Sequence, residues 1–312
     1  MANYSIWVLE YAYVPNYHVS GIIYGYHNQG YRKLPYCYVL IKGKHHAAMV
    51  DVGYNHKEFG GYLGDKFGVI NWHSPSEVLK ECSLRPEDID TVFVTHAHFD
   101  HFGNVDDFPK AKFYIQEREI AKWVWAMSLP ERTQWMMVAI DPGDVLRGVE
   151  LAKNKRLVTV NGDLVNVLPG IDLHPAYDSH TFGSMWVEVR NDGKSTSQDT
   201  WVLAGDLIYV YENLSGSGDL VGVEKIYNPE RERKISVPSK VAVKIRLAVV
   251  QKFTAWYHPK GTLKKPTIAL MQEPDSDTYV SNSGLNPSCA LRQIDFLPSH
   301  FLFLSLFPSF PA

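Results

Sequence analysis

The chain has 312 residues, of which 45% are hydrophobic and 21% charged, and such fractions exclude a disordered or fibrous protein. Its 31 Lys and Arg against 34 Asp and Glu give a net charge of -3. Because proteins that bind nucleic-acid phosphates usually carry a basic excess, nucleic acid is an unexpected partner. At about 100–200 residues per domain, the length allows one large domain or two small ones.

The cysteines and the two ends of the chain indicate a reducing, cytoplasmic setting. Cys37, Cys82 and Cys289 are odd in number and far apart, so they offer neither a disulfide framework nor a CxxC metal site. The first residues lack a basic segment and a long apolar run, so we expect no signal peptide. Residues 296–310 are rich in Phe and Leu but interrupted by proline, and a membrane helix needs about 20 apolar residues. No membrane partner is therefore expected.

Apolar runs alternate with helical patterns through the first two thirds of the chain. A cap signal at Ser74 and Pro75 begins one of the predicted helices. The run at residues 91–95 is almost continuously apolar, which is typical of a strand buried on both faces. In chain order, the sequence predicts strands at 36–41 and 46–52, a helix at 76–82, strands at 91–95 and 111–115, a helix at 116–127, and strands at 157–160, 171–176, 184–189 and 200–204.

The composition changes near residue 224. Residues 1–223 hold 19 basic and 27 acidic residues, a net charge of -8, whereas residues 224–312 hold 12 basic and 7 acidic, a net charge of +5. The last third also has weaker hydrophobic periodicity. We therefore predict one main domain at residues 1–260, followed at 261–312 by an atypical tail, disordered or loosely docked.

A dense group of metal-ligating residue types follows the strand at 91–95. Residues 95–101 read Thr-His-Ala-His-Phe-Asp-His, an HxHxDH motif with imidazoles at His96, His98 and His101 and a carboxylate at Asp100. Burying these groups without compensation would cost several kcal/mol, so packing explains them poorly. Imidazole and carboxylate are ligands that Zn²⁺, Fe²⁺ and Mn²⁺ accept. The motif therefore predicts a metal site.

Two further polar residues lie beside predicted strands downstream. His180 stands in Asp-Ser-His-Thr-Phe-Gly-Ser just before the strand at 184–189, and Asp206 stands in Ala-Gly-Asp just after the strand at 200–204. Alone, an Asp in such a place is usually a turn former or a helix cap. After HxHxDH and in this order, the two become specific candidates for ligands.

These motifs resemble those of the metallo-β-lactamase superfamily. The matching pieces are THAHFDHFG at 95–103, SHTFGS at 179–184, AGD at 204–206 and MVDVG at 49–53. Phe99 inside the first motif and Tyr209 three residues after Asp206 are similar to the lactonase branch, which includes N-acyl-homoserine lactonases and 4-pyridoxolactonase. A fungal γ-lactamase is also similar. The resemblance covers residues 35–210 and implies an α+β fold, the αββα sandwich of two mixed sheets flanked by helices.

The resemblance also implies a pair of zinc ions, with iron or manganese as alternatives. One metal would take His96, His98 and His180, the other Asp100, His101 and a late histidine, with Asp206 bridging the two. Asp100 would also move a proton to the leaving group, and Tyr209 would donate to the developing oxyanion. The alternative for Tyr209 is a packed aromatic ring with its hydroxyl in solvent. Asp51 would orient a ligand histidine, or would simply be a turn residue before Gly53.

The late histidine departs from the family pattern. His258 follows a strand-like run and lies 52 residues after Asp206, a distance that suits the family. His300 has the better local match, Phe-Leu-Pro-Ser-His, but lies 94 residues after Asp206. We prefer His258, with His300 or neither residue as the alternatives. If neither serves, the second metal loses a ligand.

The expected function is a metal-dependent hydrolase that opens a small cyclic ester or amide by attack of a metal-bound hydroxide. A lactone, a γ-lactam or a cyclic carbamate would be the substrate. The alternatives are a thioester or β-lactam hydrolase of the same superfamily, and a non-catalytic metal-binding protein with an incomplete second site. The aromatic and Met-rich stretch at residues 123–137 is either core or an apolar wall over the metals, and the oligomeric state stays open.

Overall fold

The computed structural model describes residues 3–22, 30–197, 199–209, 245–247 and 267–272. The strands are β1 (Ser5–His18), β2 (Tyr31–Lys42), β3 (Ala47–Val50), β4 (Thr91–Phe93), β5 (Lys112–Gln116), β6 (Leu157–Val160), β7 (Leu164–Leu168), β8 (Ile171–Tyr177), β9 (Gly183–Arg190), β10 (Thr200–Leu203), β11 (Ile245–Leu247) and β12 (Thr267–Gln272). The α-helices are α1 (Phe59–Phe67), α2 (Pro75–Glu81), α3 (Phe99–Phe102), α4 (Glu117–Met127) and α5 (Pro142–Lys153). Short 3₁₀ turns are η1 (Val19–Gly21), η2 (Pro86–Asp88), η3 (Val105–Asp107), η4 (Glu131–Met137) and η5 (Gly205–Leu207).

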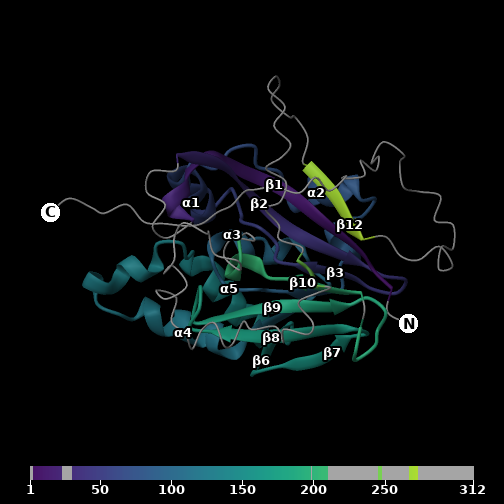
Figure 1. Cartoon of the computed structure of the whole chain (residues 1–312). Helices are drawn as coiled ribbons and strands as arrows, with labels where there is room; N and C mark the ends of the chain where they lie inside the picture. Colours follow the sequence, from purple (N-terminus) through teal and green to yellow (C-terminus); the bar gives the residue numbers. More distant parts are fainter. Residues whose placement is uncertain (1–2, 23–29, 198, 210–244, 248–266, 273–312) are drawn as a thin grey trace, which may run out of the picture.

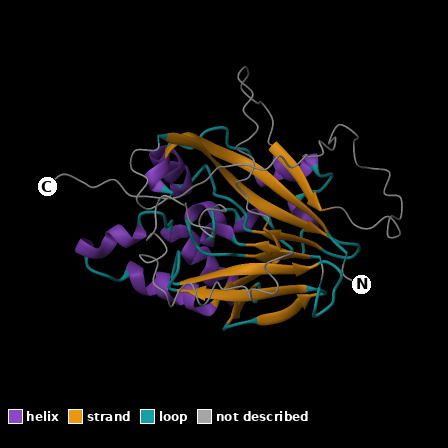
Figure 2. Ribbon diagram, in the orientation of Figure 1, coloured by secondary structure: helices purple, strands orange, loops and turns teal. Residues whose placement is uncertain are grey.

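The described strands form two mixed sheets that face each other (Figures 1 and 2). The seven-stranded sheet has the order β12-β1-β2-β3-β4-β5-β6, and the five-stranded sheet has the order β11-β10-β9-β8-β7. In the first sheet, β3, β4, β5 and β6 run parallel, while β12, β1, β2 and β3 alternate in direction. In the second, only β10 and β11 pair in parallel. The predicted α+β sandwich is confirmed.

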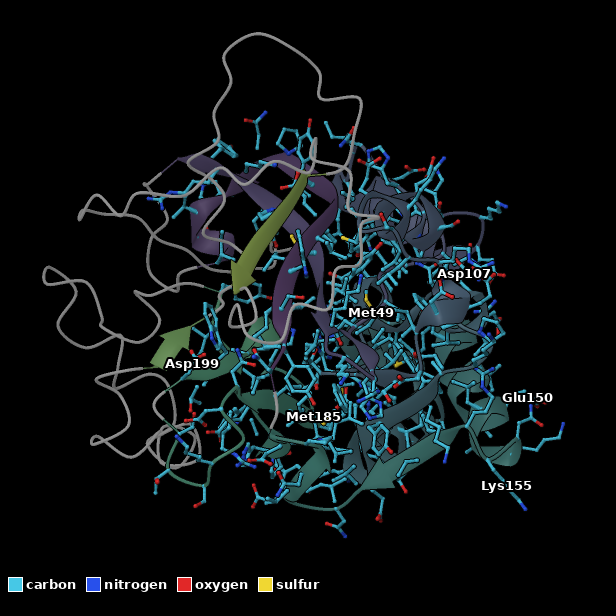
Figure 3. The ribbon with its side chains drawn as sticks, turned by 90° about the vertical axis from the view of Figure 1, so that its right-hand side faces the viewer. Met49, Asp107, Glu150, Lys155, Met185 and Asp199 are labelled. Carbon is cyan, nitrogen blue, oxygen red and sulfur yellow. The ribbon has the colours of Figure 1, made fainter. Side chains whose placement is uncertain are left out.

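Apolar side chains make two main cores on opposite faces of the seven-stranded sheet. One core joins this sheet to helices α1 to α5 and includes Met49, and the other fills the space between the sheets and includes Met185. Both methionines are fully buried, whereas Glu150 and Lys155 project from the surface at the end of α5 (Figure 3). Burial of apolar surface on both faces of β4 explains its continuous run of apolar residues.

Several predicted elements are confirmed with their physical cause. The helix predicted after Ser74 is α2, where the Ser74 hydroxyl accepts from the Glu77 N–H and the Glu77 carboxylate accepts from the Ser74 N–H. Such a capping box satisfies backbone donors that the first helical turn leaves unpaired. The remaining predicted helix and all the predicted strands appear as α4, β2, β3, β4, β5, β6, β8, β9 and β10.

Part of the region assigned to a tail by its composition pairs with the sheet. The proposed domain boundary after residue 260 lies outside the described residues, as do His258 and His300. Beyond that boundary, β12 pairs antiparallel with β1 at the edge of the seven-stranded sheet. Among the described helices, none is long and apolar enough to cross a bilayer.

We expect the buried Asp144 near the start of α5 to destabilise the fold as pH rises. Burial and the nearby Asp141 raise the pKa of Asp144 to about 8, although Arg147 donates to Oδ1 at 3.0 Å. Its Oδ2 has no hydrogen-bond partner among the described residues. The folded chain therefore holds a proton that the unfolded chain releases near pH 4, and stability falls between about pH 4 and pH 8. Asp144→Asn should remove this loss, as unfolding in urea at several pH values would measure.

The matched control for Asp144 is Asp106→Asn. Asp106 contacts the same Arg147 at 3.1 Å, but its side chain is largely exposed. This exposed variant should follow the wild-type pH dependence. A constant difference in unfolding free energy between Asp144→Asn and wild type across pH 5 to pH 8 would contradict the prediction.

Candidate functional site

The HxHxDH motif lies at the carboxyl end of β4, in the loop that leads into α3. Since β3, β4 and β5 run parallel, residues that follow them meet at one edge of the sheet. Asp51 follows β3 directly, and the loop between β8 and β9 brings His180 to the same edge. Asp206 comes there in η5, just after β10. Both sheets therefore contribute to the site.

Three imidazoles converge at the first half of the site. The Nδ1 atom of His98 lies 3.0 Å from Nε2 of His96 and 3.0 Å from Nε2 of His180. Ligand atoms around a tetrahedral zinc ion, each about 2.1 Å from it, lie about 3.4 Å apart. The three nitrogens could therefore hold one divalent metal ion.

A second group of ligand atoms adjoins the first. Nε2 of His101 lies 3.4 Å from Oδ2 of Asp100 and 3.4 Å from Oδ1 of Asp206. The other oxygen of Asp206, Oδ2, lies 3.6 Å from Nε2 of His180. The two oxygens of Asp206 thus face the two groups separately. His96, His101 and Asp206 also place one ligand atom each within 4.8 Å of one another, so His96 borders both groups.

Hydrogen bonds behind the imidazoles determine which nitrogen faces the site. The Thr95 hydroxyl donates to Oδ2 of Asp51 at 2.8 Å, so it can only accept from the neighbouring Nδ1 of His96 at 3.0 Å. Nδ1 of His101 donates to the same Asp51 oxygen at 2.7 Å. The Nε2 atoms of both histidines are thereby directed into the site, as metal-ligating histidines require.

Electrostatics divide the site into a neutral and an anionic part. Burial and the neighbouring imidazoles lower the pKa values of His96 and His98, and burial also lowers that of His180. Burial alone would lower the pKa of His101, but the surrounding carboxylates outweigh it and raise this pKa well above its usual value. The neutral imidazoles of His96, His98 and His180 beside carboxylates are a donor set that zinc, iron or manganese accepts, and a cation beside those carboxylates would displace the proton from His101.

Side-chain hydrogen bonds and a left-handed backbone conformation together hold Asp51 in place. Its Oδ1 accepts the Thr95 N–H at 2.7 Å, while its Oδ2 contacts Thr95 and His101. Its φ angle of 63° lies in the left-handed region, which non-glycine residues other than Asp and Asn rarely occupy. Asp51 therefore stands in the turn before Gly53 and also contacts a histidine of the site, while its role in orienting a metal ligand stays a prediction.

Tyr209 lies inside the site rather than with its hydroxyl in solvent. The hydroxyl donates to Oδ2 of Asp206 at 2.7 Å, and the ring lies edge-on to His180 with centroids 6.0 Å apart. Burial and the Asp206 carboxylate raise the pKa of Tyr209 well above its usual value. Tyr209 is therefore protonated at neutral pH and able to donate.

Aromatic side chains line and support the site. The centroid of the Trp123 ring system lies 6.1 Å from that of His98 and 4.8 Å from that of Phe182. The ring centroids of Phe182 and Trp125 are 6.1 Å apart. Trp123 is 4% exposed and belongs to the core, against which Met127 and Met137 pack, whereas Trp125 is 45% exposed. The exposed Trp135 likewise does not belong to the core. The stretch thus contributes to the core and also presents exposed apolar side chains.

Sequence reasoning missed three residues that hold the site from behind. Thr95 connects Asp51 to His96, and the Tyr11 hydroxyl donates to the Asp100 carbonyl at 2.8 Å. Glu119 in α4 accepts from the backbone of Ala97, between His96 and His98. Of these three residues, only Thr95 could have been selected from the sequence, because it directly precedes the HxHxDH motif. An acidic residue in a first helical turn such as Glu119 is usually explained by the helix dipole.

A further titratable cluster lies on β8 and β9, away from the motif. Asp172 binds the Arg190 guanidinium through both oxygens, and His174 contacts Asp163 and Glu188 while stacking on Trp186. Because the Arg190 guanidinium pairs with both oxygens of Asp172, this cluster is an ion-pair network. Its residues serve as controls for the main site.

Two curated proteins that are similar to this chain are N-acyl homoserine lactonases. The chain is 26% identical over 147 residues to N-acyl homoserine lactonase AiiB of Agrobacterium fabrum, and 26% identical over 147 residues to the protein of the same name from Rhizobium rhizogenes. Each match covers 47% of this chain and 50% of the relative. The chain therefore spans about half the length of the curated relatives it matches.

Comparisons with solved structures and family models identify the fold family. A quorum-quenching N-acyl homoserine lactone lactonase matches with a TM-score of 0.56 and 17% identity, over 83% of this chain and 98% of that one. A variant of B. thuringiensis AiiA with N-decanoyl-L-homoserine at its active site matches with a TM-score of 0.55 and 16% identity, over 79% and 93%. The model of the metallo-beta-lactamase superfamily matches residues 31–237, more than half of the chain. The resemblance read from the motifs is confirmed, and the chain belongs to the metallo-beta-lactamase superfamily.

Proposed function

We propose that this chain is a metal-dependent hydrolase that opens a small cyclic ester or amide, with a lactone as the first candidate substrate. The observation that carries the proposal is the convergence of two adjacent ligand groups, His96-His98-His180 and His96-His101-Asp206. Divalent cations held by these residues would supply a nucleophile derived from water and a Lewis acid for the carbonyl. We propose zinc at both places, with iron or manganese as alternatives.

The proposed ligands divide between the two cations. His96, His98 and His180 would hold the first, because their inward nitrogens already lie at ligand spacing. Asp100 and His101 would hold the second. Asp206 would bridge, which its geometry supports because its two oxygens face His101 and His180 separately.

Two side chains would act on the substrate. Asp100 has the carboxylate for passing a proton to the leaving group, a role that requires hydrogen-bond reach. Tyr209 is held protonated beside Asp206, and its single O–H would turn from the Asp206 carboxylate to donate to the developing oxyanion. Phe182 contacts both Trp125 and Trp123, the ring beside His98, and the apolar surface of Phe182 and Trp125 would contact an apolar part of the substrate.

The substrate class rests on the relatives named above, which are lactonases of homoserine lactones. We place a lactone first, a γ-lactam or cyclic carbamate next, and a thioester or β-lactam of the same superfamily after them. The acidic charge of residues 1–223 favours a small molecule over nucleic acid. The three cysteines of the chain, Cys37, Cys82 and Cys289, offer no disulfide framework, which supports a reducing, cytoplasmic setting.

A substrate and metal screen tests the proposed function. Purified full-length chain, loaded separately with Zn²⁺, Fe²⁺ or Mn²⁺, should hydrolyse N-hexanoyl-homoserine lactone, and proton release at constant pH would measure the rate. A γ-lactam, a thioester and a β-lactam provide the comparison. Chelation should abolish turnover and added metal should restore it. Full turnover after exhaustive chelation, or no bound metal at all, would overturn the proposal, and one metal per chain without turnover would support a non-catalytic metal-binding protein.

The last ligand gives a separate prediction. If His258 completes the second site, His258→Ala should lower the metal content from two ions per chain to one, because a strong imidazole donor is lost. His300→Ala should leave two ions and serves as the matched control. Metal analysis by mass spectrometry measures both. The reverse result would transfer the role to His300, and two ions in both variants would show that neither residue is a ligand.

A further inference from the structure

A buried carboxylate of α4 connects the two loops that carry the first group of histidines. Glu119 is completely buried, and four donors surround its two oxygens. Oε1 accepts from the Ala97 N–H at 2.9 Å and the Trp123 indole N–H at 2.7 Å. Oε2 accepts from the Thr181 hydroxyl at 2.7 Å and the Gly183 N–H at 2.6 Å.

Two of the four donors belong to residues that adjoin the histidines of the first group. Ala97 separates His96 from His98, and Thr181 directly follows His180. The two loops are more than 80 residues apart in sequence, and Nδ1 of His98 lies 3.0 Å from Nε2 of His180. Glu119 is bonded to both loops immediately behind these two rings. Its side chain is therefore a direct connection between the two ligand loops.

Close backbone contact limits how far this connection can move. A Cβ atom on Gly183 would lie 2.3 Å from the Glu119 nitrogen and 2.7 Å from its Cα atom. Real Cβ atoms do not approach backbone so closely, so the start of α4 and the start of β9 touch only because residue 183 is glycine (Figure 1). The contact fixes Glu119 relative to the strand that follows His180.

We propose that Glu119 is a positioning residue that sets the separation of His98 and His180 for a metal ion bound by His96, His98 and His180. This inference rests on the proposed function. Three of the four neighbours, the backbone N–H groups of Ala97 and Gly183 and the indole N–H of Trp123, can only donate, and a carboxylate can accept from all of them. An amide would place its NH₂ group against at least one of these N–H groups and leave that donor buried and unpaired.

Zinc affinity separates positioning from general stability. Replacing a side chain that orients metal ligands typically weakens metal binding 10–100-fold. Glu119→Gln in the full chain should therefore weaken zinc binding 10–100-fold in competition with a chromophoric chelator. The visible absorption of bound Co²⁺ should also change, because the ligand geometry does.

The matched control is Glu10→Gln, the same substitution at another buried carboxylate. Glu10 binds Lys33 at 2.6 Å, and Lys33 lies in neither of the loops that carry His98 and His180. It should leave zinc affinity within twofold of wild type, whatever its effect on the unfolding midpoint of the metal-free chain. Equal zinc affinities and Co²⁺ spectra in wild type and Glu119→Gln would overturn the inference.

A second pair of variants keeps the test decisive if Glu119→Gln fails to fold. Thr181→Val removes one donor to Oε2, whereas Thr181→Ser keeps the hydroxyl. Thr181→Val should weaken zinc binding several-fold and Thr181→Ser should restore it. Equal affinity in both would overturn the positioning role. If wild type itself binds no zinc, the proposed function fails instead, so the two failures are distinguishable.

Discussion

Replacing His98 with alanine is expected to remove bound metal from the first group of ligands and to lower turnover by about 10³-fold or more. Nδ1 of His98 is the atom that lies 3.0 Å from both His96 and His180, so its loss leaves only two of the three nitrogens. Metal catalysis contributes several kcal/mol to transition-state stabilisation, and each 1.36 kcal/mol is tenfold in rate. Metal analysis and kcat on the best lactone substrate would measure the two effects.

The control for His98 is another histidine outside the site. His174 on β8 is held by Asp163 and Glu188 and stacks on Trp186. His174→Ala should retain the wild-type metal content and kcat. Wild-type turnover in His98→Ala would show that the cluster is not the reaction site.

The second large effect is expected from Tyr209→Phe. Loss of one oxyanion donor costs roughly 10²–10³ in kcat, and the phenylalanine ring can keep the contact with His180. Because the hydroxyl also donates to Asp206, the metal content must be measured together with kcat. We expect kcat to fall while two metal ions per chain remain.

Other outcomes for Tyr209 assign it a different role. A joint fall in kcat and metal content would mean that Tyr209 orients Asp206 rather than the substrate. Unchanged kinetics would leave it only a packing role. Tyr38→Phe is the matched control, because the buried Tyr38 hydroxyl has no hydrogen-bond partner among the described residues. It should leave kcat and metal content unchanged.

The local parts of the site were predictable because chemistry and spacing coincide there. HxHxDH places three imidazoles and a carboxylate within six residues after a strand, a density that packing does not require. His180 and Asp206 became specific only through their order and their places at strand ends. The structure brings all of these residues together, and their roles as ligands remain predictions for the variants above.

Parts of the fold that depend on distant contacts were not predictable. The long strand β1 was missed because its apolar residues do not alternate cleanly, since both of its faces contribute to buried cores. Helix α1 was missed because three of its nine residues, Gly60, Gly61 and Gly64, disfavour a helix. Tyr54 and the backbone at Asn55 and His56 pack so closely against these positions that a side chain would collide.

Glu119 illustrates the same limit within the site. Its sequence neighbourhood, Gln-Glu-Arg-Glu-Ile, is that of an ordinary helix start. Its four donors lie on a loop 22 residues before it, on its own helix, and on a loop more than 60 residues after it. No local pattern contains that information, because the tertiary contact alone creates the environment that requires a carboxylate.

The left-handed backbone of Asp51 restricts which substitutions could ever be accepted there. Aspartate, asparagine and glycine tolerate a φ of 63°, whereas β-branched residues do not. Of these three, only aspartate can accept from both Thr95 and His101 through a charged side chain. A library randomised at residue 51 and selected for folding alone should therefore return all three residues, while selection for turnover should return aspartate alone. The difference between the two outcomes separates what the backbone tolerates from what the chemistry requires.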